Sequence, residues 1–107
     1  MRKYIGEDIT IRSQIDGNKA TLSPEGRIDT ITSPELKEAV AKLPEGVTSL
    51  TLDLSQADYV SSAGLRVLLG AQKRMGTAGG TMTVTNVCEA VRNVFDITGF
   101  SSILTIV

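Results

Sequence analysis

The sequence of 107 residues contains no histidine, no tryptophan and only one cysteine, Cys88. Without histidine the chain cannot build a Ser-His or Cys-His nucleophile, the usual proton shuttle at neutral pH, or a His-ligated zinc site. A single cysteine excludes an internal disulfide and fits a reducing compartment, and we interpret Cys88 as a small buried apolar side chain on a helix. These absences argue against an enzyme, and we expect no metal ion and no other cofactor.

The net charge is also small, and aromatic side chains are few. The net charge is -1, and the aromatic residues are two tyrosines and two phenylalanines. Such a chain has neither the basic footprint for nucleic acid or an anionic membrane nor a platform on which bases could stack. The N-terminal stretch "MRKYIGEDIT" becomes polar too early for a signal peptide, and no apolar run is long enough to span a bilayer. We expect a cytoplasmic protein that neither binds nucleic acid nor inserts into a membrane.

The length suits one domain covering residues 1–107. Weak alternation over residues 9–15, a turn at "DGN" and a second strand opening at residues 20–22 predict a hairpin. Pro24 cannot donate a hydrogen bond to a ladder, so it indicates a bulge or a sheet edge. Later alternation predicts strands in "LTLDLS" and "TMTVTN", and "ILTIV" at residues 103–107 predicts a short last strand.

Three helices are expected between and after these strands. The first has Ser33 as its predicted N-cap, followed by Pro34 and by Glu35 in its first turn. The third is predicted to be capped by Asn86, with Glu89 three residues later in a capping box. Strands that alternate with helices in this way run parallel with right-handed crossovers. The predicted fold class is therefore α/β, a small mixed sheet opened by a hairpin and continued as βαβαβ with helices packed on it.

The second helix, in "ADYVSSAGLRVLLGAQKRM", begins at Ser62 or Ala63 and has no acidic residue in its first turn. Its N-terminus, equivalent to about half a positive charge, is thus left without an acidic partner, and it directly follows a strand, where α/β sheets place their sites. Gly64 allows another backbone to approach closely. Three interpretations stay open: a serine that only caps the helix, a site for a ligand phosphate, or a phosphorylated serine.

Other phosphate-binding and catalytic motifs are missing. The sequence has no GxxxxGK[ST] loop, no GxGxxG after a strand and no GxSxG elbow. We interpret Asp53 and Asp58 as residues of a strand's solvent face and of a turn rather than as a catalytic pair. We interpret Lys73 and Arg74 near the end of the second helix as stabilising its C-terminus and not as a binding patch.

Three stretches, "GRIDTITSPEL", "LTLDLSQADYVSSAGLRVLLGAQKRM" and "VCEAVRNVFDITGF", resemble blocks of the bacterial anti-sigma factor antagonists of the STAS-domain family. The resemblance covers about residues 9–106 and implies one STAS domain. In that family the serine two residues before the glycine of the middle block is phosphorylated by a partner kinase, and here that serine is Ser62. An aspartate often precedes it in the family, whereas this chain has Ser61, which is an alternative acceptor.

The resemblance implies a protein-interaction switch. The unmodified domain would bind an anti-sigma factor that is also a serine kinase, phosphorylation would release it, and a phosphatase could reverse the change. The expected contact surface combines residues near the start of the second helix with one residue of "GRID" and two residues that precede the serines. These are Asp29, Tyr59, Val60, Ser61, Ser62, Ala63, Gly64 and Arg66.

Two other functions remain as alternatives. One is a STAS module of another system, such as a lipid-transport accessory or a stressosome-like scaffold, and the other is a small domain that binds a nucleotide or another ligand. Many family members carry a further helix after the last strand, whereas this chain stops at Val107 and that helix is expected to be absent. Its absence would expose apolar surface around residues 103–107 and favour weak self-association through the last strand.

Overall fold

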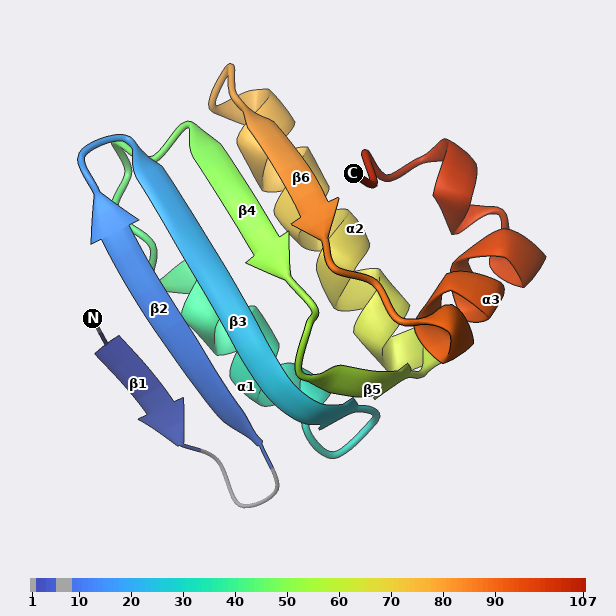
Figure 1. Cartoon of the computed structure of the whole chain (residues 1–107). Coiled ribbons are helices and arrows are strands. Elements are labelled where there is room, and N and C mark those ends of the chain that lie inside the picture. Colours follow the sequence, from blue (N-terminus) through green and yellow to red (C-terminus); the bar gives the residue numbers. More distant parts are fainter. Residues whose placement is uncertain (1, 6–8) are drawn as a thin grey trace.

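The fold is organised around one long strand, β3 (Lys19–Ile28), which has three neighbours in the computed structural model (Figure 1). The structure describes residues 2–5 and 9–107. Strand β2 pairs with β3 in antiparallel orientation, as the predicted hairpin requires, whereas β4 and β5 run parallel to it. The strands of the described residues form one sheet in the order β1-β2-β3-β4-β6, with β5 beside the end of β3. The other strands are β1 (Arg2–Ile5), β2 (Thr10–Asp16), β4 (Ser49–Asp53), β5 (Ala57–Val60) and β6 (Thr81–Thr85).

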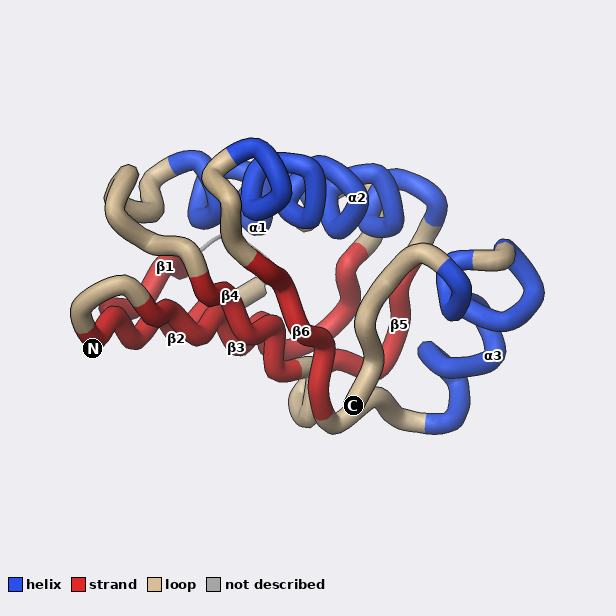
Figure 2. Tube along the Cα trace, turned by 90° about the horizontal axis from the view of Figure 1, so that it is seen from above, coloured by secondary structure: helices blue, strands red, loops and turns tan. Residues whose placement is uncertain are grey.

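The helices cover this sheet unevenly. Helices α1 (Ser33–Ala41) and α2 (Ser62–Thr77) lie next to each other on one face, and α3 (Glu89–Thr98) packs against β5 at one end of the molecule (Figure 2). A short 3₁₀ helix, η1 (Phe100–Ser102), follows α3. The strand-helix alternation and the parallel strands confirm the predicted α/β class. No helix among the described residues is long and apolar enough to cross a membrane.

One apolar cluster joins the two layers. The inward-facing leucines of β4, the apolar stripe of α1, and Met82 and Val84 of β6 are buried in it, as their patterns predicted. Of the predicted stripe of α2, Leu65 and Leu68 are buried, whereas Leu69 and Gln72 are only half-buried. Burial of such side chains contributes about 1.5 to 3 kcal/mol each for the larger ones. This packing holds the junction between β5 and α2 in a fixed position relative to the rest of the sheet.

Pro24 lies inside β3, opposite Ile11 of β2, and not at an edge of the sheet. Leu22 is the last residue of β3 that pairs with β4, and Gly26 is the first that pairs with β5. Pro24 lies between the part of β3 that pairs with β4 and the part that pairs with β5. Its missing N–H therefore removes no hydrogen bond to either of these two strands. The β3–β2 register is regular at Pro24, so the predicted bulge is absent there; the β3–β5 register shifts two residues later, between Gly26 and Arg27.

Two predicted helix caps are wrong. Helix α1 begins at Ser33 itself, with Thr32 as an N-cap that makes no side-chain cap hydrogen bond. Helix α3 begins at Glu89, and the residue before it, Cys88, makes no side-chain cap hydrogen bond either. Asn86 instead adopts a left-handed φ of 57° at the end of β6, and its amide donates to Asp53 Oδ1 at 3.1 Å. Its side chain is therefore used to hold β6 beside β4.

Four further differences concern a single residue or a short segment. Cys88 is exposed at the start of α3, so its interpretation as a buried side chain is wrong. The predicted last strand is reduced to one parallel bridge between Val84 and Ile106, although Ile103 and Val107 are exposed as expected. Residues 57–60, interpreted from the sequence as part of a turn, form strand β5. Only the two end residues of this strand are buried, so its sequence lacks the period-two pattern of a strand. The short strand β1 was not predicted.

Candidate functional site at the start of α2

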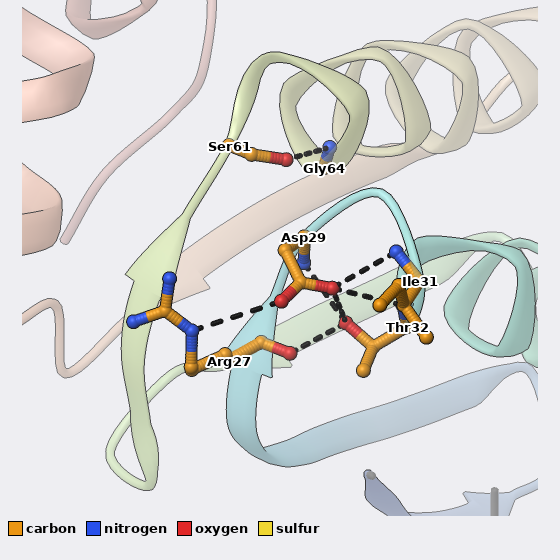
Figure 3. Close-up of polar contacts among 6 residues, drawn as sticks. All are labelled: Arg27, Asp29, Ile31, Thr32, Ser61 and Gly64. Carbon is orange, nitrogen blue, oxygen red and sulfur yellow. Dashed lines mark hydrogen bonds and ion pairs between the residues drawn. The ribbon is translucent and has the colours of Figure 1, made fainter. Parts of the chain in front are cut away.

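Ser62 is the first residue of α2, and its side chain is exposed. The N-cap is Ser61, whose Oγ accepts a hydrogen bond from the Gly64 N–H at 3.4 Å (Figure 3). Among the described residues nothing forms a hydrogen bond with the Ser62 hydroxyl, and the first turn of α2 contains no acidic residue. The structure thus divides the two serines: Ser61 caps the helix, and Ser62 presents a free hydroxyl at its positive end.

The start of α2 is pressed against the end of β3. The N–H of Ser61 donates to the carbonyl of Ile28 at 2.8 Å, so β5 passes into α2 directly beside the last residue of β3. A Cβ at Gly64 would lie 2.8 Å from both the carbonyl oxygen and Cγ2 of Ile28. Only glycine leaves room for this approach, which confirms the expectation of a close backbone contact at Gly64, here with the chain's own β3.

Asp29 follows β3 immediately and lies near this helix start, as predicted (Figure 3). Its Oδ1 accepts hydrogen bonds from the N–H groups of Ile31 at 2.9 Å and of Thr32 at 3.1 Å. The Thr32 hydroxyl accepts from the Asp29 N–H and donates to the carbonyl of Arg27 at 2.5 Å. The N–H of Thr32 lowers the pKa of the Asp29 carboxyl against the raising effect of desolvation, with further lowering by Ile31 and Arg27. Asp29 is therefore an ionised turn residue that holds the loop before α1.

Arg27 completes this cluster and was not predicted as a site residue. Its Nε lies 3.7 Å from Asp29 Oδ2, and its guanidinium carbon lies 4.2 Å from the centre of the Tyr59 ring. The guanidinium of Arg27 and the ring of Tyr59 face each other because these two residues are partners in the β3–β5 ladder. The spacing of Arg27 and Asp29, two residues apart at the end of a strand, was the signal in the sequence that both side chains share a face.

The predicted contact residues do not all reach the surface. Val60 is 1% exposed and belongs to the core, and Gly64 is buried against β3, so neither can contact a partner through a side chain. Tyr59 is 37% exposed and Arg66, one turn after Ser62, is exposed. We call the accessible residues among them, together with Arg27 and Ile31, the Ser62 surface. It consists of Arg27, Asp29, Ile31, Tyr59, Ser61, Ser62, Ala63 and Arg66.

The other carboxylates have structural surroundings. Asp53 Oδ1 accepts hydrogen bonds from the N–H of Ser55 at 3.0 Å and from the amide of Asn86. Burial raises the pKa of Asp53, but these hydrogen bonds outweigh it and the pKa is lowered overall. Asp58 is exposed on β5. The residues of the described ranges contain no cluster of three side chains that could hold a metal ion.

Comparison with known proteins assigns this arrangement to a family. Residues 10–107 match the STAS domain. The chain therefore belongs to the STAS-domain family of anti-sigma factor antagonists. It is 30% identical over 99 residues to the anti-sigma-B factor antagonist of Bacillus subtilis, covering 92% of this chain and 91% of that protein. It is 35% identical over 83 residues to the anti-sigma-B factor antagonist of Listeria monocytogenes, covering 76% and 72%.

A solved structure of an anti-sigma factor antagonist from Mycobacterium paratuberculosis superimposes on this STAS domain with a TM-score of 0.80. The two are 26% identical, and the match covers 92% of this chain and 84% of the other. The names of these relatives describe regulators and not enzymes, in agreement with the expectation drawn from the missing histidine. The resemblance to the family is thus confirmed for the fold and for nearly the whole chain.

Proposed function

We propose that this STAS domain binds an anti-sigma factor through the Ser62 surface and that phosphorylation of Ser62 releases it. The observation that carries the proposal is that two adjacent serines have different roles in the structure. Ser61 is half-buried and uses its hydroxyl as the helix cap, whereas Ser62 is exposed and its hydroxyl is free to react. This division favours Ser62 over Ser61 as the phosphate acceptor, and the same anti-sigma factor would act as the serine kinase.

A phosphate on Ser62 would have a favourable place in the free domain. It would add about 1.5 to 2 negative charges at the positive end of a helix of 16 residues that has no acidic side chain in its first turn. Backbone N–H groups at a helix start are suited to phosphate oxygens. The modification therefore requires no refolding of the domain, and its effect on binding must come from the interface.

Inside a protein interface the same phosphate would be desolvated, at an effective cost of several kcal/mol unless the partner supplies a cation. A loss of about 4 kcal/mol weakens binding roughly a thousandfold. Other residues of the Ser62 surface are suited to a tight contact, because Tyr59 and Arg27 are residue types that dominate interface energetics and Ile31 is 70% exposed. A charge placed next to such a contact has a large effect on the affinity.

The proposal can be tested with the cognate kinase, which an adjacent anti-sigma factor gene would identify. Incubation with ATP should add one phosphate to the domain, and mass spectrometry should find it on Ser62. Ser62→Ala should abolish incorporation, while Ser61→Ala, the matched control one residue away, should still accept phosphate. Incorporation into Ser62→Ala at an unchanged level would assign the modification elsewhere.

Binding provides the second half of the test. Calorimetry should show that Ser62→Ala binds the anti-sigma factor like the unmodified domain and that Ser62→Asp binds at least tenfold more weakly, since aspartate carries less charge than phosphate. Equal affinities of the two variants would contradict a switch that acts through charge. Two further parts of this proposal stay predictions: a phosphatase removes the phosphate from Ser62, and the protein is cytoplasmic.

A further inference from the structure

A groove of about 420 Å³ lies between α1 and α2. Small residues of both helices line this space. Ala41 of α1 and Ala63 and Gly70 of α2 line it, and a Cβ added at Gly70 would meet no atom within 4 Å. The volume falls within the range of about 300 to 1,000 Å³ that is typical of small-molecule sites.

The lining of the groove combines an apolar floor with charges of one sign. Val40 and Val67 lie among the small residues, and the charged side chains that line the groove are Lys37, Arg66 and Arg74, without a carboxylate. Apolar walls with a few polar groups at one place are the usual composition of a site for an organic ligand. The excess of positive charge selects a ligand with an anionic group.

The three cations differ in what they already bind. The guanidinium of Arg74 donates to the carbonyls of Val40 and Leu43, the latter at 2.6 Å, near the end of α1, so it is committed to joining the helices. Lys37 and Arg66 form no ion pair with any residue between 9 and 107. They approach the groove from opposite helices, and both charges remain available to a ligand.

We propose that this groove binds an aliphatic carboxylate with a single chain. The hydrocarbon chain would cover the floor at Val67 and Gly70, and the carboxylate would lie between Lys37 and Arg66. The binding is reversible and involves no chemical step. The groove shares Ala63 and Arg66 with the Ser62 surface, but Ser62 itself does not line it, so the proposal does not depend on phosphorylation of Ser62.

Decanoate is a suitable probe, with 1-decanol as the neutral molecule of equal chain length. Titration of the unphosphorylated domain, followed by backbone amide chemical shifts, should show one saturable site for decanoate with shifts in the facing residues of α1 and α2. Arg66→Ala should weaken decanoate binding by about two- to fivefold, as expected for an exposed ion pair, and leave decanol binding unchanged. Equal affinities of the wild type for decanoate and decanol would overturn the role of the cations.

Filling the groove gives the sharper test. Gly70→Leu places a side chain in open space inside the groove and replaces a poor helix former, so the melting temperature should rise by about 4 °C while decanoate binding is lost. Gly76→Leu is the matched control, because Gly76 lies in the same helix, also borders open space and is not part of the groove. It should bind decanoate like the wild type.

Two other results would overturn the proposal by assigning the groove to another occupant. The first is a wild-type dimer in sedimentation that Gly70→Leu dissociates, which would identify a second copy of the chain. The second is a domain that does not bind decanoate at all, whose affinity for the anti-sigma factor falls in Gly70→Leu but not in Gly76→Leu. In that case the proposed function would stand and the groove would belong to the protein interface.

Discussion

Helices α1 and α2 begin side by side at the end of the β3–β5 pair, yet their first turns are organised in opposite ways. The loop before α1 is held by the ionised carboxylate of Asp29, and Glu35 adds a second acidic side chain to the first turn. The first turn of α2 has one long hydrogen bond to the hydroxyl of Ser61 and no acidic side chain. One helix start thus has anions from its own sequence, and its neighbour has none.

The two serines at these helix starts show what the difference means for regulation. Ser33, the first residue of α1, is 6% exposed and lies beside acidic residues, so a kinase could not reach it and a phosphate there would be repelled. Ser62, the first residue of α2, is exposed at a helix start without acidic residues. The same residue type at the same helix position is structural in one case and suited to modification in the other.

The largest effect on stability is expected at Gly64, where the start of α2 packs against β3. Gly64→Ala would place a Cβ 2.8 Å from the carbonyl oxygen of Ile28 and force the start of α2 away from β3. We expect a loss of about 2 kcal/mol in the free energy of unfolding, measured by urea denaturation. Gly70→Ala in the same helix meets open space and should stabilise the domain by up to about 1 kcal/mol. Equal stabilities of the two variants would show that α2 is not in tight contact with β3.

A smaller effect should separate the two serines of α2. Ser61→Ala removes the helix cap and should cost about 0.5 to 1 kcal/mol, at the low end of cap substitutions because the hydrogen bond is long. Ser62→Ala removes no hydrogen bond to a described residue and should change stability by less than about 0.5 kcal/mol. Thermal unfolding of both variants measures the difference. A greater loss in Ser62→Ala would reverse the roles assigned to these residues.

The smallest effect should depend on pH and concerns the start of α1. The folded state lowers the pKa of Asp29, so the carboxylate stabilises the fold above the ordinary aspartate pKa of about 3.9, and this contribution is lost as pH falls through the lowered value. Asp29→Asn should therefore reduce the urea midpoint at pH 7, and the gap to the wild type should shrink below about pH 4. A gap that is independent of pH would mean that the charge of Asp29 does not support the turn.

Short-range patterns made much of this structure predictable. Alternation located β4 and β6, the "DGN" turn located the hairpin, and the missing acid in "SSAGL" drew attention to the start of α2. The errors fall where residues distant in the sequence meet. Asn86 was predicted as a helix cap because such residues favour caps, but Asp53 on a neighbouring strand binds its side chain. Strand β5 exists only because β3 supplies its hydrogen-bonding partner.

The sequence by itself determined the fold class, the family and the serine pair, since these depend on residue spacing along single elements. Tertiary structure decided which of the two hydroxyls is free, that Val60 is buried, and that Arg27 stacks on Tyr59 beside Asp29. It also decided that small residues of α1 and α2 line one groove together with Lys37 and Arg66, which form no ion pair with any described residue. The reason is physical: exposure and contact depend on what packs against a residue, and a linear sequence does not contain that information.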